Sequence, residues 1–165
     1  MNKLWLLLAL AVTLSVFDLS PFQTTDLSRL SPVQTMVITG EAGALRVDCG
    51  EGLSGRGADL AEALADLKAG AEGTVFLGTA QDIVLCADPQ VWGQLTQIPE
   101  LRPAAELYQS AESVAPGDVQ GFLQQHQSGV TLLDLRIGLL YEEAVAVPSL
   151  RQEEGGYRLV NGKPL

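Results

Sequence analysis

An uncharged, strongly apolar run at the start of the chain limits how much of it can fold into a domain. The run covers residues 4–17 (LWLLLALAVTLSVF), with Lys3 before it and Asp18 after it. A positive charge, an apolar core and a polar exit are the parts of an export signal. The run is shorter than the roughly 18 residues expected of a membrane span. Residues 16–18 (VFD) also contain no pair of small residues for cleavage.

We therefore expect residues 1–17 to direct export in one of two forms. In the first, the segment is retained as a membrane anchor, Lys3 stays cytoplasmic and the body lies outside. In the second, it is a signal peptide cleaved near Thr13 or Ser15, and the body is secreted. The anchor would be formed by Leu4, Trp5, Leu6, Leu7, Leu8, Leu10, Val12, Leu14, Val16 and Phe17.

The rest of the chain divides into a tether and a body. Residues 18–32 (DLSPFQTTDLSRLSP) are polar, contain two prolines and are predicted to form the tether. Residues 33–165 have the length of one domain, and a subdivision would fall near residues 112–117. The body is rich in Leu, Ala, Val and Gly, so it can bury a core.

The charge of the chain limits its partners. Its formal net charge is −10 and its pI is about 4.4. A nucleic acid partner is not expected, because no basic patch exists to displace counterions from phosphates. Anionic lipid headgroups would repel the body, so membrane contact is expected through the leader alone.

Apolar periodicity predicts alternating strands and helices. Strands are predicted at residues 33–38, 44–49, 74–77, 82–86, 145–150 and 157–160. Helices are predicted to begin at Asp59, Asp88, Pro116 and Thr131, the first ending at Gly70. Residues 101–110 fit a helix and a strand equally well.

The last of these helices has two apolar sides. Thr131 and Asp134 form a capping box at its start. One stripe contains Leu132, Leu135 and Leu139, and a second contains Leu133, Ile137 and Leu140. Two apolar sides predict a helix wedged between the sheet and a neighbouring element.

The glycine-rich segment at residues 50–57 (GEGLSGRG) is the first candidate for a binding motif. Gly50, Gly52 and Gly55 have the spacing G-x-G-x-x-G, which occurs in dinucleotide-binding loops. The preceding strand reads as half of a hairpin, however, and the helix cap falls at Asp59, beyond the third glycine. We therefore predict a flexible connection between hairpin and helix, and we expect no cofactor.

The remaining chemical groups form no catalytic set. His126 lies among glutamines without a carboxylate partner in the sequence, so a hydrolase would require the fold to supply one. Cys49 and Cys86 could pair as a disulfide after export, although two separate buried thiols are favoured. No CxxC motif is present, and no metal site is expected.

Short segments along the body occur in an order that resembles a known family. They are DL (26–27), VI (37–38), LRV (45–47), GADLAEAL (57–64), VFLG (75–78), IVL (83–85), PELR (99–102), VTLLD (130–134), VPSL (147–150) and YRLV (157–160). In type and order they resemble the strands and helices of the N-terminal region of the spore germinant receptor C subunits, the Ger(x)C lipoproteins. That family has a lipidated cysteine near the position of Asp18, so the resemblance implies a short relative without the lipid.

These observations lead to an expected fold and function. The fold is an α/β (α+β-like) domain, with a mixed β-sheet flanked by helices and a small C-terminal helix-plus-strand portion. The function is that of a membrane-anchored, extracytoplasmic, non-catalytic interaction protein. The resemblance implies a role in spore germination or sporulation, with other membrane receptor subunits as partners. The alternative is a secreted protein that binds a small molecule or cell-wall fragment in a pocket beside residues 50–57.

Overall fold

The structure is a computed structural model that describes residues 30–162. The apolar leader, with every residue named above as an anchor, lies outside this range. Within it, none of the helices combines the length and the apolar character needed to cross a bilayer.

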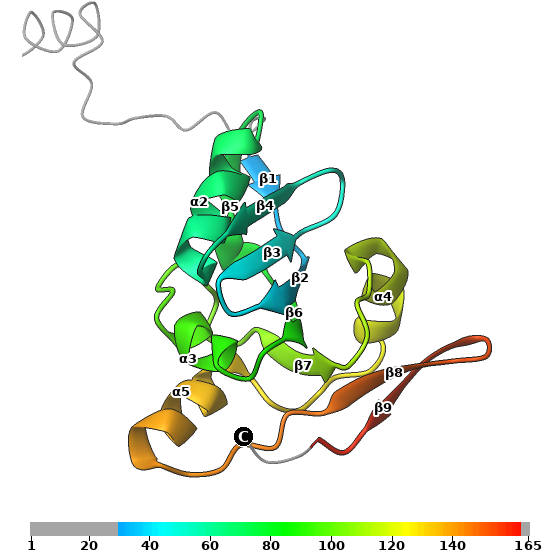
Figure 1. The fold of residues 1–165 in the computed structure, drawn as a ribbon. Helices are drawn as coiled ribbons and strands as arrows, with labels where there is room; N and C mark the ends of the chain where they lie inside the picture. The colour runs from blue at the N-terminus through cyan, green and yellow to red at the C-terminus, as the bar shows by residue number, and fades with distance from the viewer. Residues whose placement is uncertain (1–29, 163–165) are drawn as a thin grey trace, which may run out of the picture.

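A mixed sheet of seven strands forms the centre of the molecule (Figure 1), in the order β4-β3-β2-β6-β7-β8-β9. The strands are β2 (Thr35–Glu41), β3 (Ala44–Asp48), β4 (Ser54–Gly57), β6 (Asp82–Ala87), β7 (Glu106–Ser110), β8 (Ser149–Glu153) and β9 (Gly156–Val160). The central four, β2, β6, β7 and β8, are parallel, and antiparallel strands complete both edges. A separate parallel pair joins β1 (Leu30–Pro32) to β5 (Thr74–Phe76).

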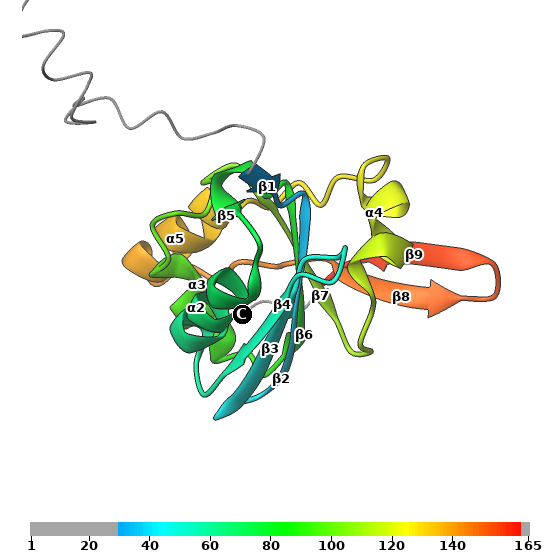
Figure 2. The same cartoon turned by 90° about the horizontal axis from the view of Figure 1, so that it is seen from above.

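Helices cover the two faces of this sheet unequally. They are α2 (Leu60–Gly70), α3 (Val91–Thr96), α4 (Pro116–Leu123) and α5 (Leu132–Tyr141), with a short 3-10 turn η2 (Leu77–Thr79) before β6. Figure 2 shows α2, α3 and α5 on one side of the sheet and α4 on the other. The prediction of an α/β fold with a mixed sheet flanked by helices is therefore confirmed.

Each side of the sheet has its own apolar core. Met36, Ile38 and Ile83 point into the larger core, under α2, α3 and α5. Val37 and Val84 point the other way, into a smaller core under α4. Burial on both faces explains why residues 36–38 of β2 and 83–86 of β6 are continuous apolar runs rather than alternating ones.

Two helices begin as the sequence predicts. Asp59 caps α2, where its Oδ1 accepts the N–H of Glu62 at 2.8 Å. Thr131 and Asp134 form the expected box at α5: the Asp134 N–H donates to Thr131 Oγ1 at 3.3 Å, and the Thr131 N–H donates to Asp134 Oδ2 at 2.8 Å. Each cap satisfies N–H groups that have no partner inside the helix.

The prediction of a flexible connection over residues 50–57 is wrong in its second half, because residues 54–57 form β4. The glycines explain the difference, since they let α2 lie unusually close to this strand. A Cβ on Gly55 would lie 2.2 Å from the Ala63 carbonyl oxygen and 2.3 Å from the Leu67 nitrogen. The outward N–H of Arg56 is capped by the Asp66 carboxylate of α2 at 2.9 Å.

Several predicted boundaries also move. Residues 30–32, expected to end the tether, form β1, because β5 offers them a parallel partner. The ambiguous stretch 101–110 contains a strand, β7, which completes the parallel centre of the sheet. The strand expected at residues 145–150 starts only at Ser149, where pairing with Gln109 of β7 begins.

The expectation that α5 is wedged between two elements is wrong. The helix packs on one side only, through Leu132, Leu135 and Gly138. The Arg136 guanidinium fixes it to the end of α3 by donating to the Thr96 and Ile98 carbonyl oxygens at 3.1 and 2.8 Å. No described element covers its other side, so the second apolar stripe faces solvent, and Leu139 at the end of the first stripe is also 54% exposed.

Replacement of Gly55 tests the close contact between β4 and α2. We expect Gly55→Ala to lower the free energy of unfolding by about 1–3 kcal/mol, because the new methyl group collides with backbone rather than with a movable side chain. Gly121→Ala in α4 is the control, since a Cβ there meets nothing within 4 Å. This control should be neutral or stabilising by up to about 1 kcal/mol. Urea denaturation of both variants gives the comparison, and equal stability of Gly55→Ala and the wild type would contradict it.

Candidate functional site

A cleft of about 710 Å³ lies beside the glycine-rich turn. Its walls come from four segments that are distant in sequence. They are the residues leading into β2, the turn at 49–53, the end of α2 and the start of α4. The side chains that matter most for its chemistry are Gln34, Thr35, Cys49, Glu51, Glu72 and Gln120. The cleft lies where the alternative function, binding of a small molecule, requires one.

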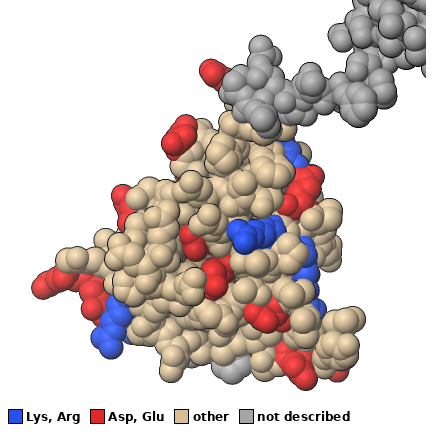
Figure 3. Space-filling view, turned by 180° about the vertical axis from the view of Figure 1, so that it is seen from behind, with Lys and Arg blue, Asp and Glu red and all other residues tan. Residues whose placement is uncertain are grey.

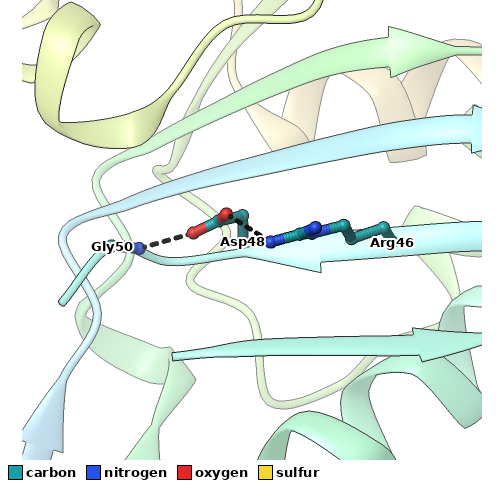
Figure 4. A network of polar contacts seen from close by, with 3 residues as sticks. All are labelled: Arg46, Asp48 and Gly50. Atoms are coloured by element: carbon teal, nitrogen blue, oxygen red, sulfur yellow. Dashed lines mark hydrogen bonds and ion pairs between the residues drawn. The ribbon is translucent and has the colours of Figure 1, made fainter. Parts of the chain in front are cut away.

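The turn at residues 49–53 has an unusual backbone. Gly50, Glu51 and Gly52 all have left-handed φ values, of 79°, 51° and 78°. Asp48 holds this turn, because its Oδ1 accepts the Gly50 N–H at 3.0 Å while its Oδ2 accepts from Arg46 at 3.3 Å (Figure 4). The turn joins two antiparallel strands, so the G-x-G-x-x-G spacing does not form the strand–loop–helix unit of a dinucleotide site.

Two side chains join the opposite walls of the cleft. The Gln120 amide of α4 donates to Gln34 Oε1, at the entrance to β2. Next to Gln34, Thr35 is 2% exposed, and its Oγ1 has no hydrogen-bond partner within the described structure. A buried hydroxyl without a partner costs free energy, and nearly all such groups in proteins are paired. The Thr35 hydroxyl at the wall of the cleft is therefore available to form a hydrogen bond with a group that enters the cleft.

A row of polar residues continues from Thr35 across the first positions of three parallel strands. Thr35 pairs with Asp82, and Asp82 pairs with Glu106. Neighbours in register point to the same side of a parallel sheet, here the side of α4. Glu106 Oε2 accepts from the Ser128 hydroxyl and from the Gly129 N–H, the latter at 2.9 Å. This carboxylate thereby ties the segment before α5 to the sheet.

Burial changes the acidity of this row. The pKa of Asp82 is raised to about 6, first by loss of water around its carboxyl group and second by the charge of Glu106. Tyr108, fully buried beside them, also has a raised pKa, chiefly because of burial. Its hydroxyl donates to the His126 carbonyl oxygen at 3.1 Å. An ionised Asp82 is therefore held in the native state at a cost in stability.

The two cysteines are free thiols. Strand β2 lies between them, since Cys49 follows the end of β3 and Cys86 belongs to β6. Neighbouring strands are about 4.8 Å apart, so the Cα atoms of residues two strands apart are separated by about twice that distance. This separation exceeds the roughly 7 Å over which a disulfide can join two Cα atoms. Burial raises the pKa of Cys49 to about 12, helped by the charge of Asp48, and burial also raises the pKa of Cys86. Both thiols are consequently poor nucleophiles at neutral pH.

His126 does not enter a catalytic arrangement within the described residues. Its ring stacks on Phe122 with ring centroids 4.2 Å apart, and its Nδ1 contacts the Phe122 carbonyl oxygen at 3.0 Å. No carboxylate in residues 30–162 forms a hydrogen bond or ion pair with it. The same part of the chain has no group of three or more His, Cys, Asp or Glu side chains that could hold a metal.

A second candidate is the uncovered side of α5, which we call the α5 face. It consists of Leu133, Ile137, Leu140 and Tyr141, spaced so that they lie along one side of the helix. These side chains are 48%, 42%, 74% and 68% exposed. The sequence pattern identified most of these residues as apolar but assigned them to the interior.

Charged side chains elsewhere do not form a single surface. On the face seen in Figure 3, Lys and Arg are scattered among Asp and Glu, with wide uncharged areas between them. This face offers no gathered basic surface of the kind that nucleic acid requires.

Comparison of the chain with family models, with curated proteins and with solved structures gives no match.

Replacement of Asp82 tests the state of the buried row. The pKa of Asp82 in the folded protein lies above its ordinary value of 3.8, so its contribution to stability is full below about pH 4 and is lost as the pH rises through 6. Asp82→Asn should therefore raise the free energy of unfolding by about 2–3 kcal/mol at pH 8 and leave it unchanged near pH 4. Thermal unfolding followed by circular dichroism at both values gives the measurement. Glu154→Gln, on an exposed turn, is the control, and a pH-independent effect of Asp82→Asn would contradict the assignment.

Proposed function

We propose that this protein is a membrane-anchored, extracytoplasmic, non-catalytic interaction protein, and that the α5 face is its docking surface. The observation that carries the proposal is the exposure of four large apolar side chains on one side of a well-anchored helix. Soluble monomers rarely leave such contiguous apolar surface in water unless it serves binding. The export signal at residues 4–17 supports a location outside the cytoplasm.

The α5 face is rigid rather than frayed, which suits a docking surface. The capping box fixes its first turn, and Arg136 ties its middle to the end of α3. At its far end, the chain turns back through Glu142, whose φ is 56°, and passes over Gly138. A helix already held in its binding conformation loses little conformational entropy when a partner docks.

Charges around the α5 face define the partner. Asp134 lies at one end of the helix, and Glu142 and Glu143 lie at the other. The basic residue of the helix, Arg136, is engaged with α3. Two copies meeting through this face would bring acidic groups together in either orientation, so the charges disfavour a homodimer. We infer a protein partner with an apolar groove whose rim carries Lys or Arg.

The resemblance to the germinant receptor C subunits supports a more specific version of this proposal. In that version the partner is another membrane receptor subunit, and the protein acts in spore germination or sporulation. An anchor formed by residues 4–17 would hold the α5 face near such a partner at the membrane surface. Detection of the protein in the cytosol of its native host would rule out this version.

Photo-crosslinking in the native host tests the docking surface. We expect p-benzoylphenylalanine in place of Tyr141 to give a discrete adduct in membranes that differs in mass from a dimer of the chain. Leu133→Ser with Leu140→Ser should abolish the adduct and change the free energy of unfolding by less than about 0.5 kcal/mol, because both side chains are exposed. Phe76→Ser is the matched control, since Phe76 is an exposed apolar residue on a different element.

Charge reversal then tests the chemistry of the partner. Glu142→Lys with Glu143→Lys should weaken the adduct, because a basic rim would repel the new charges. A self-adduct, adducts with lipid alone, or no adduct would each contradict the proposed partner. An adduct strengthened by charge reversal would contradict the basic rim.

A further inference from the structure

We propose that the cleft beside residues 49–53 binds a small organic amine, a molecule that carries a positive charge together with hydrogen-bonding groups. This site is separate from the α5 face, and the proposal does not depend on the docking function. It rests on the charges of the walls, the shape of the turn and the Thr35 hydroxyl, which has no hydrogen-bond partner among the described residues.

The charged groups around the cleft are acidic. Glu51 stands on the turn, and Glu72 stands on the segment that follows α2. Among the described residues that line the cleft, none is Lys or Arg. Behind Thr35, the carboxyl groups of Asp82 and Glu106 lie on the same side of the sheet. A cation entering the cleft is attracted by all of these groups, whereas an anion is repelled.

The backbone of the turn brings Glu51 to the cleft. Glu51 is one of two residues other than glycine with a positive φ in the described structure, and it lies between two glycines in the same conformation. Such conformations are unfavourable for residues with a Cβ and are concentrated at functional sites. The Asp48 carboxylate holds the turn by accepting the Gly50 N–H. The Glu51 side chain makes no hydrogen bond in the described part of the chain.

The neutral polar groups suit the rest of such a ligand. Thr35 Oγ1 is almost completely buried and has no partner in the described structure. The adjacent Gln34–Gln120 hydrogen bond joins side-chain amides from two walls, and each amide both donates and accepts. Entry of a ligand between these amides would exchange one hydrogen bond for two or more and would give Thr35 a partner. These groups favour a ligand that has hydroxyl or amine groups besides its charge.

The start of α4 does not turn the cleft into an anion site. Pro116 has no N–H group, and the N–H groups of Asp118 and Val119 both donate to the Ala115 carbonyl oxygen, at 3.1 and 3.3 Å. Asp118 also places a negative charge in the first turn. Few backbone N–H groups at the start of α4 therefore remain to bind an anion, and the charge of Asp118 offsets the positive end of the helix dipole.

Three sugars that share a ring and differ in charge test the proposal. The ¹⁵N-labelled full chain in detergent micelles is titrated with glucosamine, N-acetylglucosamine and glucuronate, and with spermidine as an amine that is not a sugar. We expect saturable amide shifts at Thr35, Glu51, Glu72 and Gln120 with glucosamine or spermidine. N-acetylglucosamine should bind at least about tenfold more weakly, the effect of one lost charge-assisted contact. Glucuronate should cause no shifts at these residues.

Substitutions of the side chains that line the cleft test whether these side chains bind the amine. Glu51→Gln with Glu72→Gln should weaken amine binding about tenfold, while Glu153→Gln with Glu154→Gln, on the β8–β9 hairpin, should leave it unchanged. Thr35→Val keeps the shape of the side chain and should weaken binding without lowering the melting temperature. Absence of shifts with both amines, equal binding of all three sugars, or binding unaffected by the cleft variants would each overturn the proposal. The α5 face is intact in every variant, so these outcomes are independent of the crosslinking experiment.

Discussion

The close approach of α2 to β4 is the contact on which the rest of this structure depends. Helix α2 can rest on the sheet at this distance only because Gly55 and Gly57 have no side chains. The contact places Leu60, Leu64 and Leu67 in the main core, under the same side of the sheet as α3 and α5. The contact also fixes the end of the turn at residues 49–53, because β4 follows that turn directly and is held against α2. Packing of the core and the wall of the cleft therefore share one cause.

Local signals in the sequence were sufficient to predict most elements. The caps at Asp59 and Thr131 predicted the starts of α2 and α5, because a helix cap is a short-range interaction that depends on neighbours in sequence. The alternation of residues 44–49 predicted β3 for a similar reason. The α/β class followed from the order of these elements.

Long-range contacts decided the features that could not be predicted. The residues of β4 (SGRG) have little strand propensity, and they become a strand only because β3 and α2 lie on either side. The two apolar stripes of α5 are indistinguishable in the sequence, and only the position of the helix at the margin of the fold determines that Leu132 and Leu135 are buried while Leu139 and the second stripe are exposed. The cleft combines four distant segments, so its single local signal was the glycine-rich turn.

The polar row formed by Thr35, Asp82 and Glu106 connects both candidate surfaces. At one end, Thr35 lies at the wall of the cleft. At the other, Glu106 holds Ser128 and Gly129, which lead directly into α5. A core built for stability alone would not place two carboxyl groups on adjacent strands beside a hydroxyl that has no partner within residues 30–162. The row therefore lowers the stability of the fold, but it attaches both the cleft beside residues 49–53 and the α5 face to one rigid sheet.

The two edges of the sheet differ in a way that affects how copies of the protein could aggregate. At β4, the Asp66 carboxylate accepts the outward N–H of Arg56, and α2 covers the strand. A strand from another copy therefore cannot pair with β4. At β9, the outer edge has no paired strand in the described structure. Two copies could therefore join β9 to β9, but the product would have a blocked edge at each end. Such assembly terminates at a pair, and the fold is protected against open-ended fibril growth through this sheet.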